Sequence, residues 1–424
     1  MLFSLQARVV FPVDRPPIEQ GVVTIDAERI VAVGISAIGD EPVHDLGDVA
    51  LLPGLVNAHT HLEFSDLAQP LGKPGMALAD WIPFVLAHRR GRDANPQAAI
   101  AAGMQESLRS GVTTIGEIAT AGAAAYANLI SPDVNLLIEA IGFSGARAES
   151  ALQAAIQQLD AFEWEFGAVG GSLGEPGIQL GLSPHAPYTV SPALLSSLVT
   201  LARKRNLPVA MHIAESTDEL ELLDCGTGRF QQLLDERSMW DATAIPRGSS
   251  PFDYLRLLAQ APRALVIHGN YLDRDEHEFL ATHRDRMSLV YCPRTHAYFC
   301  HSPYPLSELL AAGVRVALGT DSRASNPDLS LLAEMRHVAR AHPGIALTAI
   351  LRMGTLSGAE ALGRERECGS ITAGKLANLV AVRLSLGANG EPADVLDAIL
   401  SSVATTSAIW YRGREMPQRS ATAE

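Results

Sequence analysis

Lysine is scarce in this chain of 424 residues. Of its 33 basic residues only Lys73, Lys204 and Lys375 are lysines, and 47 acidic residues leave a formal net charge of −14. A chain with this excess of negative charge lacks the basic surface that binds nucleic acids or anionic lipid headgroups. We therefore expect no nucleic-acid partner. With three lysines in the chain, few positions could supply a lysine to a metal site.

Cysteine is also rare. The chain has four cysteines and no Cys-x-x-Cys pair, which excludes a disulfide framework and a thiolate zinc site. The N-terminus lacks the basic segment and the apolar stretch of about 7–15 residues that form a secretory signal. No run of about 18 apolar residues could cross a bilayer. We expect a reduced, cytoplasmic protein without a membrane span.

Short apolar runs alternate with helical stretches between about residues 53 and 365. The helical stretches include Pro96–Ser110, Pro192–Arg205 and Leu329–Ala341. Eight apolar runs are candidate strands: Gly54–Asn57, Thr113–Glu117, Val134–Ala140, Gln179–Ser183, Pro208–His212, Leu265–His268, Ser288–Tyr291 and Arg315–Gly319. An eightfold strand–helix alternation favours an α/β fold of the (β/α)8 barrel type over an open sheet.

Strand-like segments also flank this central region on both sides. They are Arg8–Phe11, Gly21–Asp26 and Arg29–Val33 before it, and Ala377–Leu384 and Ile409–Arg412 after it. We expect residues 1–52 and 366–424 to meet as one small β domain beside a barrel formed by residues 53–365.

Histidines and carboxylates lie at or just after the ends of four of the eight candidate strands. They are His59 and His61, then His212 with Glu215 three residues later, then His268, and finally Asp321. Residues i and i+2 of a strand face one side, and the C-terminal strand ends of a barrel surround its active site. Imidazoles and carboxylates are natural zinc ligands and are costly to bury unpaired. Any one motif would also suit ordinary surface or core histidines, but together they predict a metal site.

Taken together, these motifs resemble those of the amidohydrolase superfamily. Four segments carry the resemblance within the barrel: Pro53–His61, His212–Glu215, His268–Gly269 and Gly319–Ser322. The segment from Gly369 to Val380 resembles the return of that family into a small β-sandwich, although Asn378 stands where an aspartate is more usual. The resemblance implies a distorted (β/α)8 barrel with a small β-sandwich domain built from both chain termini.

Members of that superfamily hold one divalent ion, or two bridged by a carboxylated lysine. None of the three lysines ends a middle strand of the predicted barrel, so we expect one ion per chain. The resemblance implies that His59, His61, His212 and Asp321 hold it. Zinc is the expected metal, and such a ligand set also suits Fe²⁺ or Mn²⁺.

The resemblance also implies roles for three catalytic residues, Glu215, His268 and Asp321. Glu215 and Asp321 are expected to move protons between water, a ring nitrogen and the leaving amine. His268 is expected to orient the attacking oxygen or the developing oxyanion.

Four further residues are candidates for substrate binding. His185, in a segment resembling that of adenosine-derivative deaminases, would contact a nucleoside, or else is a turn histidine between prolines. Glu63 and Trp81 would line the pocket, although Trp81 equally suits a core or lid position. Arg294, in a Cys-Pro-Arg-Thr segment similar to that of aminodeoxyfutalosine deaminases, would meet a substrate carboxylate or hold a loop.

The resemblance to the deaminase branch implies an enzyme that hydrolyses a cyclic amidine. We expect a small-molecule substrate, an aminated purine or nucleoside-like heterocycle, that releases ammonia, and a homodimer is suggested by the resemblance. Two alternatives use the same site: release of chloride or alkylamine from a triazine, and opening of a cyclic amide as in imidazolonepropionase. A scaffold protein without activity is a third alternative, but a scaffold would need none of Glu215, His268 and Asp321.

Overall fold

Eight parallel strands form the centre of the molecule, which we describe from a computed structural model. The structure describes residues 2–39, 42–91, 96–126, 132–167, 177–384, 390–401 and 404–417. The strands follow one another in the sheet in chain order. They are β8 (Leu55–Thr60), β9 (Val112–Ala119), β10 (Asp133–Ala140), β11 (Ile178–Pro184), β12 (Pro208–Ile213), β13 (Arg263–His268), β14 (Met287–Tyr291) and β15 (Val316–Leu318). All eight predicted strands are confirmed.

The sheet closes between its first and last strands. Thr60 of β8 forms a parallel bridge with Asp321, which follows β15, and the Asp321 N–H donates to the carbonyl oxygen of His59 at 3.1 Å. The side chain of Asn57 adds bonds to the hydroxyl and backbone N–H of Thr320 at 2.8 and 3.1 Å. The seam of the barrel therefore lies where the predicted metal ligands meet.

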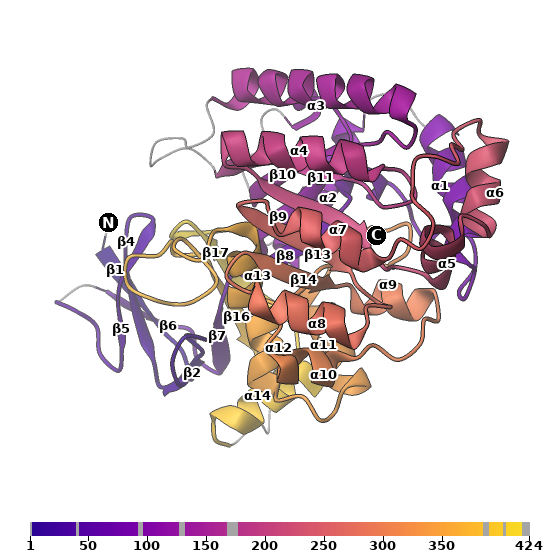
Figure 1. Cartoon of the computed structure of the whole chain (residues 1–424). Helices are drawn as coiled ribbons and strands as arrows, with labels where there is room; N and C mark the ends of the chain where they lie inside the picture. Colours follow the sequence, from indigo (N-terminus) through magenta and orange to yellow (C-terminus); the bar gives the residue numbers. More distant parts are fainter. Residues whose placement is uncertain are drawn as a thin grey trace.

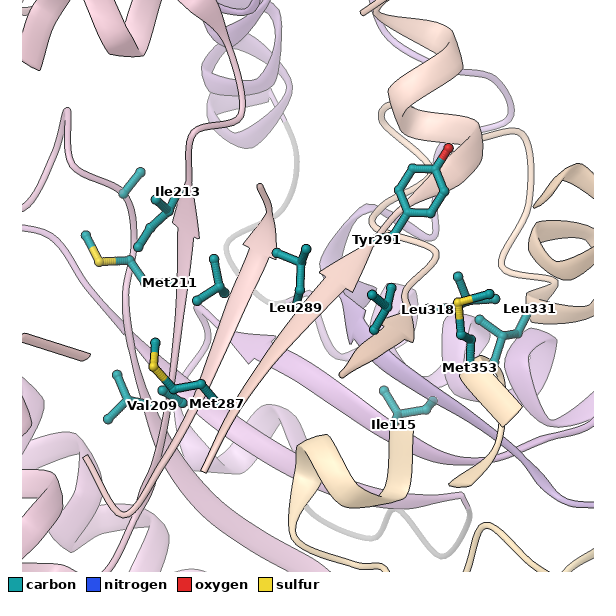
Figure 2. Packing of buried hydrophobic residues seen from close by; sticks show 14 of the residues in the cluster. Ile115, Val209, Met211, Ile213, Met287, Leu289, Tyr291, Leu318, Leu331 and Met353 are labelled. Atoms are coloured by element: carbon teal, nitrogen blue, oxygen red, sulfur yellow. The ribbon is translucent and has the colours of Figure 1, made fainter. Parts of the chain in front are cut away.

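Side chains alternate between the inside and the outside of the barrel. On β12, Val209, Met211 and Ile213 belong to the large apolar cluster between strands and helices, whereas Ala210 belongs to the smaller cluster inside. Figure 2 shows these three outer side chains along β12, with Leu289 and Tyr291 along β14. Full burial of one such apolar side chain stabilises the fold by about 1.5–3 kcal/mol. Because successive side chains of a strand point to opposite faces, His212 faces the inside of the barrel.

Helices surround the barrel and connect its strands (Figure 1). They are η1 (Leu62–Phe64), α1 (Leu78–Gly91), α2 (Gln97–Arg109), η2 (Ala123–Tyr126), α3 (Gly145–Phe166), α4 (Pro192–Arg205), α5 (Thr217–Cys225), α6 (Arg229–Glu236), α7 (Pro251–Leu258), α8 (Arg274–Thr282), α9 (Pro293–Tyr298), α10 (Leu306–Ala312), α11 (Leu331–Ala341), α12 (Leu347–Met353), α13 (Leu356–Leu362) and α14 (Pro392–Ser401). No helix in the described ranges is both long and apolar enough to cross a bilayer.

Helix α4 shows how local signals set the bounds of an element. Ser191 accepts a hydrogen bond from the Leu194 N–H at 3.3 Å, and Pro192 occupies the first helical position. Asn206 ends the helix in a left-handed conformation with φ of 54°. A capping serine, a proline at the first turn and an asparagine after the last turn are common start and stop signals, and they explain why the predicted bounds are confirmed.

Two further sheets lie beside the barrel (Figure 1). One has the order β5-β4-β1-β6 and the other β18-β17-β16-β7-β2-β3. Their strands are β1 (Leu2–Gln6), β2 (Val9–Val10), β3 (Ile18–Glu19), β4 (Val22–Asp26), β5 (Arg29–Gly34), β6 (Val43–Asp45), β7 (Val49–Pro53), β16 (Leu379–Arg383), β17 (Thr406–Tyr411) and β18 (Arg414–Glu415). The second sheet joins strands from both ends of the chain, which confirms the predicted β-sandwich of two termini.

Gly54 lies where the chain passes from β7 to β8. A Cβ atom at this position would lie 2.1 Å from the Thr113 hydroxyl oxygen, so only glycine fits. The apolar run before His59 is thus divided between the sandwich and the barrel. The predicted domain bounds at residues 52 and 365 stay a prediction. Helix α14, which lies within residues 366–424, packs against α11 and α12, which lie within residues 53–365.

Candidate active site

Three histidines converge at the C-terminal end of the barrel. His59 lies on β8, His61 follows that strand, and His212 lies on β12. One ring nitrogen from each lies within 4.8 Å of the other two, and the ring centroids are 4.9 to 5.5 Å apart. All three are buried. They form a metal-binding cluster of the kind that the motifs at the strand ends together predict.

The hydrogen bonding of these imidazoles fits a metal ion. Both ring nitrogens of His59 and the Nδ1 atom of His61 are buried without a hydrogen-bond partner among the described residues. His212 Nδ1 lies 2.9 Å from the carbonyl oxygen of His185, which fixes the ring and leaves its Nε2 atom for the cluster. Because buried polar atoms without partners are costly, donor atoms arranged in this way suit a cation.

Lysine does not contribute to this cluster. Lys73 is exposed in the segment before α1, Lys204 is exposed on α4, and the Lys375 ammonium donates to the Cys368 carbonyl oxygen at 3.1 Å. None is within the histidine cluster, and the expectation of a single ion stays a prediction.

Asp321 lies beside the histidine cluster. Its Oδ1 atom is 3.5 Å from His59 Nε2 and 3.7 Å from His61 Nε2, and its Oδ2 atom accepts from the Ser325 hydroxyl at 3.1 Å. Its backbone is left-handed, with φ of 55°, which is uncommon outside glycine. Burial opposes ionisation, but His59, His61 and other imidazoles outweigh it and hold the pKa of Asp321 well below its usual range. Asp321 is therefore an anion that a cation at the cluster would meet.

Glu215 and His268 face one another next to the cluster. His268 Nε2 lies 3.5 Å from Glu215 Oε1, and the His268 ring centroid is 5.4 Å from that of His212. Burial, and then the charges of Asp321 and Glu219, raise the pKa of Glu215 well above its usual value. Burial lowers the pKa of His268. A carboxyl group that readily holds a proton beside a neutral imidazole suits proton transfer.

His185 also lies next to His212, and their ring centroids are 5.1 Å apart. Its Nδ1 atom is 2.7 Å from the Thr189 hydroxyl oxygen. Burial, followed by the charge of Arg89, lowers the pKa of His185 to about 3. His185 is therefore a neutral imidazole at the barrel mouth, within reach of a ligand beside His212.

Two further candidates, Glu63 and Trp81, bond to the protein itself. Glu63 is buried; its Oε1 atom accepts from the Arg89 guanidinium at 2.6 Å and from the Thr120 hydroxyl at 2.8 Å. Trp81 on α1 donates from Nε1 to the Leu71 carbonyl oxygen at 2.9 Å, and its ring meets Phe299 edge-on at 5.2 Å. These contacts fix both side chains firmly, and their predicted role in substrate binding stays a prediction.

Arg294, on α9, lies in a dense network of bonds. Its Nε atom donates to the buried Glu334 at 2.6 Å, and its Nη2 atom donates to the Asp328 carboxylate at 2.7 Å. Its backbone N–H also donates to Glu334, at 2.9 Å. This geometry favours the alternative, an arginine that holds a loop, so we leave Arg294 out of the proposed site.

Sequence reasoning missed several buried carboxylates that support the site. Glu219, in the first turn of α5, is fully buried and accepts from the backbone N–H groups of Ala214 and Glu215. Glu117 on β9 accepts from the Leu62 N–H at 2.9 Å. The Ser216-x-x-Glu219 spacing, which is typical of a helix start, is a signal that could have drawn attention to Glu219.

Sequence comparisons agree with this geometry. A model of the amidohydrolase family matches residues 50–409. A 5-methylthioadenosine/S-adenosylhomocysteine deaminase of Moorella thermoacetica is 32% identical over 396 residues, which are 88% of this chain and 83% of that protein. An aminodeoxyfutalosine deaminase of Deinococcus radiodurans is 30% identical over 333 residues, 74% of this chain and 73% of that protein.

Solved structures share the fold over nearly the whole chain. Aminofutalosine deaminase of Helicobacter pylori in complex with methylthio-coformycin has a TM-score of 0.81 at 23% identity, covering 98% of this chain and 100% of that one. An adenosine deaminase of Xanthomonas campestris with bound zinc has a TM-score of 0.76 at 25% identity, covering 97% and 92%. A triazine hydrolase variant has a TM-score of 0.79 at 21% identity, covering 100% and 96%. Because the family model matches residues 50–409, which are most of this chain, the chain belongs to the amidohydrolase family.

Proposed function

We propose that this chain is a metal-dependent hydrolytic deaminase that acts on a nucleoside of the adenosine type. The observation that carries the proposal is the His59–His61–His212 cluster with Asp321 and the Glu215–His268 pair beside it. A buried cation site beside a carboxyl group that can carry a proton suits the attack of water on an amidine carbon. The deaminases among the relatives support this reaction for the chain as a whole.

We further propose one ion per chain, zinc, held by His59, His61, His212 and Asp321. When bound, such an ion supplies Lewis acidity that brings the pKa of a water to about 7. Glu215 takes a proton from the attacking water and delivers it to the adjacent ring nitrogen. His268, 3.5 Å from Glu215, orients the attacking oxygen and stabilises the negative charge that develops on it.

Asp321 carries the second proton of the attacking water to the leaving amine. A carbon–oxygen bond forms at the ring carbon, the carbon–nitrogen bond to the amino group breaks, and ammonia leaves. The left-handed backbone of His268 and Asp321, with φ of 67° and 55°, holds both side chains where their strands end. Such strained conformations are common at sites where geometry matters for reaction.

Several features favour an adenosine-type substrate over the alternatives. His185 is neutral, and its position beside His212 suits a hydrogen bond to a nucleoside. The 32% identical relative is named a deaminase of 5-methylthioadenosine and S-adenosylhomocysteine, and the 30% identical one a deaminase of aminodeoxyfutalosine, whereas the likeness to triazine hydrolase is one of fold. We therefore place triazine hydrolysis and cyclic-amide opening second, with no observation that favours either.

A substrate panel tests this function. The zinc-loaded protein is incubated with 5′-methylthioadenosine, S-adenosylhomocysteine, adenosine, aminodeoxyfutalosine, guanine, cytosine and a chlorinated triazine, and ammonia and chloride are measured. We expect ammonia from at least one adenosine derivative, with kcat/KM well above that for the free bases. Chloride release without ammonia release would instead identify a triazine hydrolase.

A further inference from the structure

The turn that carries Glu215 is held by two neighbouring segments, the one after β13 and the first turn of α5. Ala214, which precedes Glu215, has a left-handed backbone with φ of 52°. From the segment after β13, the Gly269 N–H donates to the Ile213 carbonyl oxygen at 3.0 Å and the Tyr271 N–H to that of Ala214 at 3.1 Å. These bonds engage the carbonyl groups of the turn and leave its N–H groups to another partner.

That partner is Glu219. Its Oε1 atom accepts from the Ala214 N–H at 2.7 Å, and its Oε2 atom accepts from the Glu215 N–H at 3.1 Å. The side chain is fully buried, and its own N–H donates to the Ser216 hydroxyl at the start of α5. One carboxyl group thus fixes two consecutive peptide groups, one of which belongs to Glu215.

We propose that Glu219 is a positioning residue for the reaction: it holds the strained Ala214–Glu215 peptide so that the Glu215 carboxyl group meets His268 and the reacting atoms. The proposal rests on the proposed function, because it assumes that Glu215 transfers protons. The Glu219 carboxyl group is buried against the backbone of the turn and need not touch substrate. A displacement of about 1 Å in a catalytic group can cost about 100-fold in rate, so such a holding contact has a large effect.

Another buried glutamate offers a matched control. Glu276 accepts from the backbone N–H of Asp273 at 2.8 Å, in the capping box of α8. It is 3% exposed, and its hydrogen bond lies at a helix start outside the Glu215 turn. The Glu276→Gln and Glu219→Gln variants therefore both alter a buried carboxyl group that accepts from backbone, but only the second changes a group that bonds to the turn.

The test is a double-mutant cycle on the zinc-loaded protein with the best substrate of the panel. We expect Glu219→Gln to lower kcat by about 10- to 100-fold while KM and zinc content stay within about twofold. In a Glu215→Gln background the same change should lower kcat no further, because Glu219 acts through Glu215. Glu276→Gln should leave kcat within about twofold. Deuterium uptake of the peptide that spans residues 212–216 should rise in Glu219→Gln and not in Glu276→Gln.

Each contrary result has a distinct meaning. Wild-type kcat in Glu219→Gln, or a multiplicative loss in the double variant, would overturn the positioning role and leave the proposed function intact. If Glu219→Gln does not fold, Glu219→Asp, whose shorter side chain cannot reach both N–H groups, takes its place with the same expectations. A wild-type protein that releases ammonia from no substrate of the panel would contradict the proposed function itself.

Discussion

Individual residues at this site depart from what their type prefers. Glu215 is a buried acid whose pKa is raised, and Ala214, His268 and Asp321 have left-handed backbone although none is glycine. Departures of this kind are expected where function, not stability, sets the conformation. The residue scale is therefore where the proposed mechanism can be tested most simply.

Glu215→Gln is expected to separate chemistry from binding. Glutamine keeps the shape of the side chain but cannot accept the proton of water, so kcat should fall by about 10²–10⁴. Zinc content and KM should change little, because the four proposed ligands and His185 are untouched. Steady-state kinetics and elemental analysis measure these quantities. Near-wild-type turnover would disprove the assigned role, and loss of zinc would make Glu215 a ligand.

His59→Ala and Asp321→Ala are expected to lose metal and activity together. Each removes one of four proposed ligands, and an incomplete ligand set binds zinc weakly. Wild-type protein should contain about one ion per chain, as predicted from the single ligand set and the lack of a suitable lysine. Elemental analysis after dialysis measures the content. Two tightly bound ions in the active wild-type protein would contradict the mononuclear proposal.

At the scale of elements, α9 and α11 are joined by Arg294. Arg294→Met is expected to destabilise the protein by about 3–5 kcal/mol, because it leaves the fully buried Glu334 without its cationic partner. KM should stay near the wild-type value, since the guanidinium bonds to the protein. Urea unfolding and steady-state kinetics check both parts. A raised KM with unchanged stability would restore Arg294 as a substrate residue.

The capping box of α8 should give stability a specific pH dependence. Burial raises the pKa of Glu276 from its ordinary value near 4.5 to about 7, so the folded state favours the protonated form. The contribution of Glu276 to the stability of the folded state is complete below its ordinary pKa of about 4.5, and it is lost as the pH rises through about 7. Because a neutral amide at this position would mimic the protonated acid, we expect Glu276→Gln to gain stability relative to wild type between about pH 5 and 8. Unfolding curves with a pH-independent difference would contradict this.

The elements were predictable from the sequence because their signals are local. The eight barrel strands are apolar runs bounded by polar residues, and His59, His212, His268 and Asp321 could be placed because barrel strands carry function at their C-terminal ends. The Ser216-x-x-Glu219 spacing indicates a helix start but not the contacts of Glu219 with Ala214 and Glu215, because these partners are backbone groups of a left-handed turn that no local pattern indicates. The partners of Arg294 lie 34 and 40 residues away in sequence, and only the folded chain brings them together.

At the scale of the whole molecule, the small domain supports the barrel away from the site. The Tyr411 hydroxyl and the Arg412 guanidinium donate to the Asp133 carboxylate at 2.6 and 2.8 Å. Asp133 begins β10, at the end of the strand opposite the histidine cluster. In barrels this end contributes stability, whereas the other end carries chemistry. We therefore expect activity to depend on the histidine cluster at the C-terminal end of the barrel and not on the contacts of Asp133 at the other end.

Metal-dependent hydrolysis is tested by following oxygen and nitrogen through the reaction. Protein stripped of metal with a chelator, and the same protein with one equivalent of zinc restored, are given the best substrate of the panel in ¹⁸O-labelled water. We expect one ammonia and one ¹⁸O atom in the product for each turnover of the zinc-restored protein, and almost no turnover without metal. Full activity of the stripped protein, or a product without solvent oxygen, would contradict a metal-dependent hydrolytic deaminase.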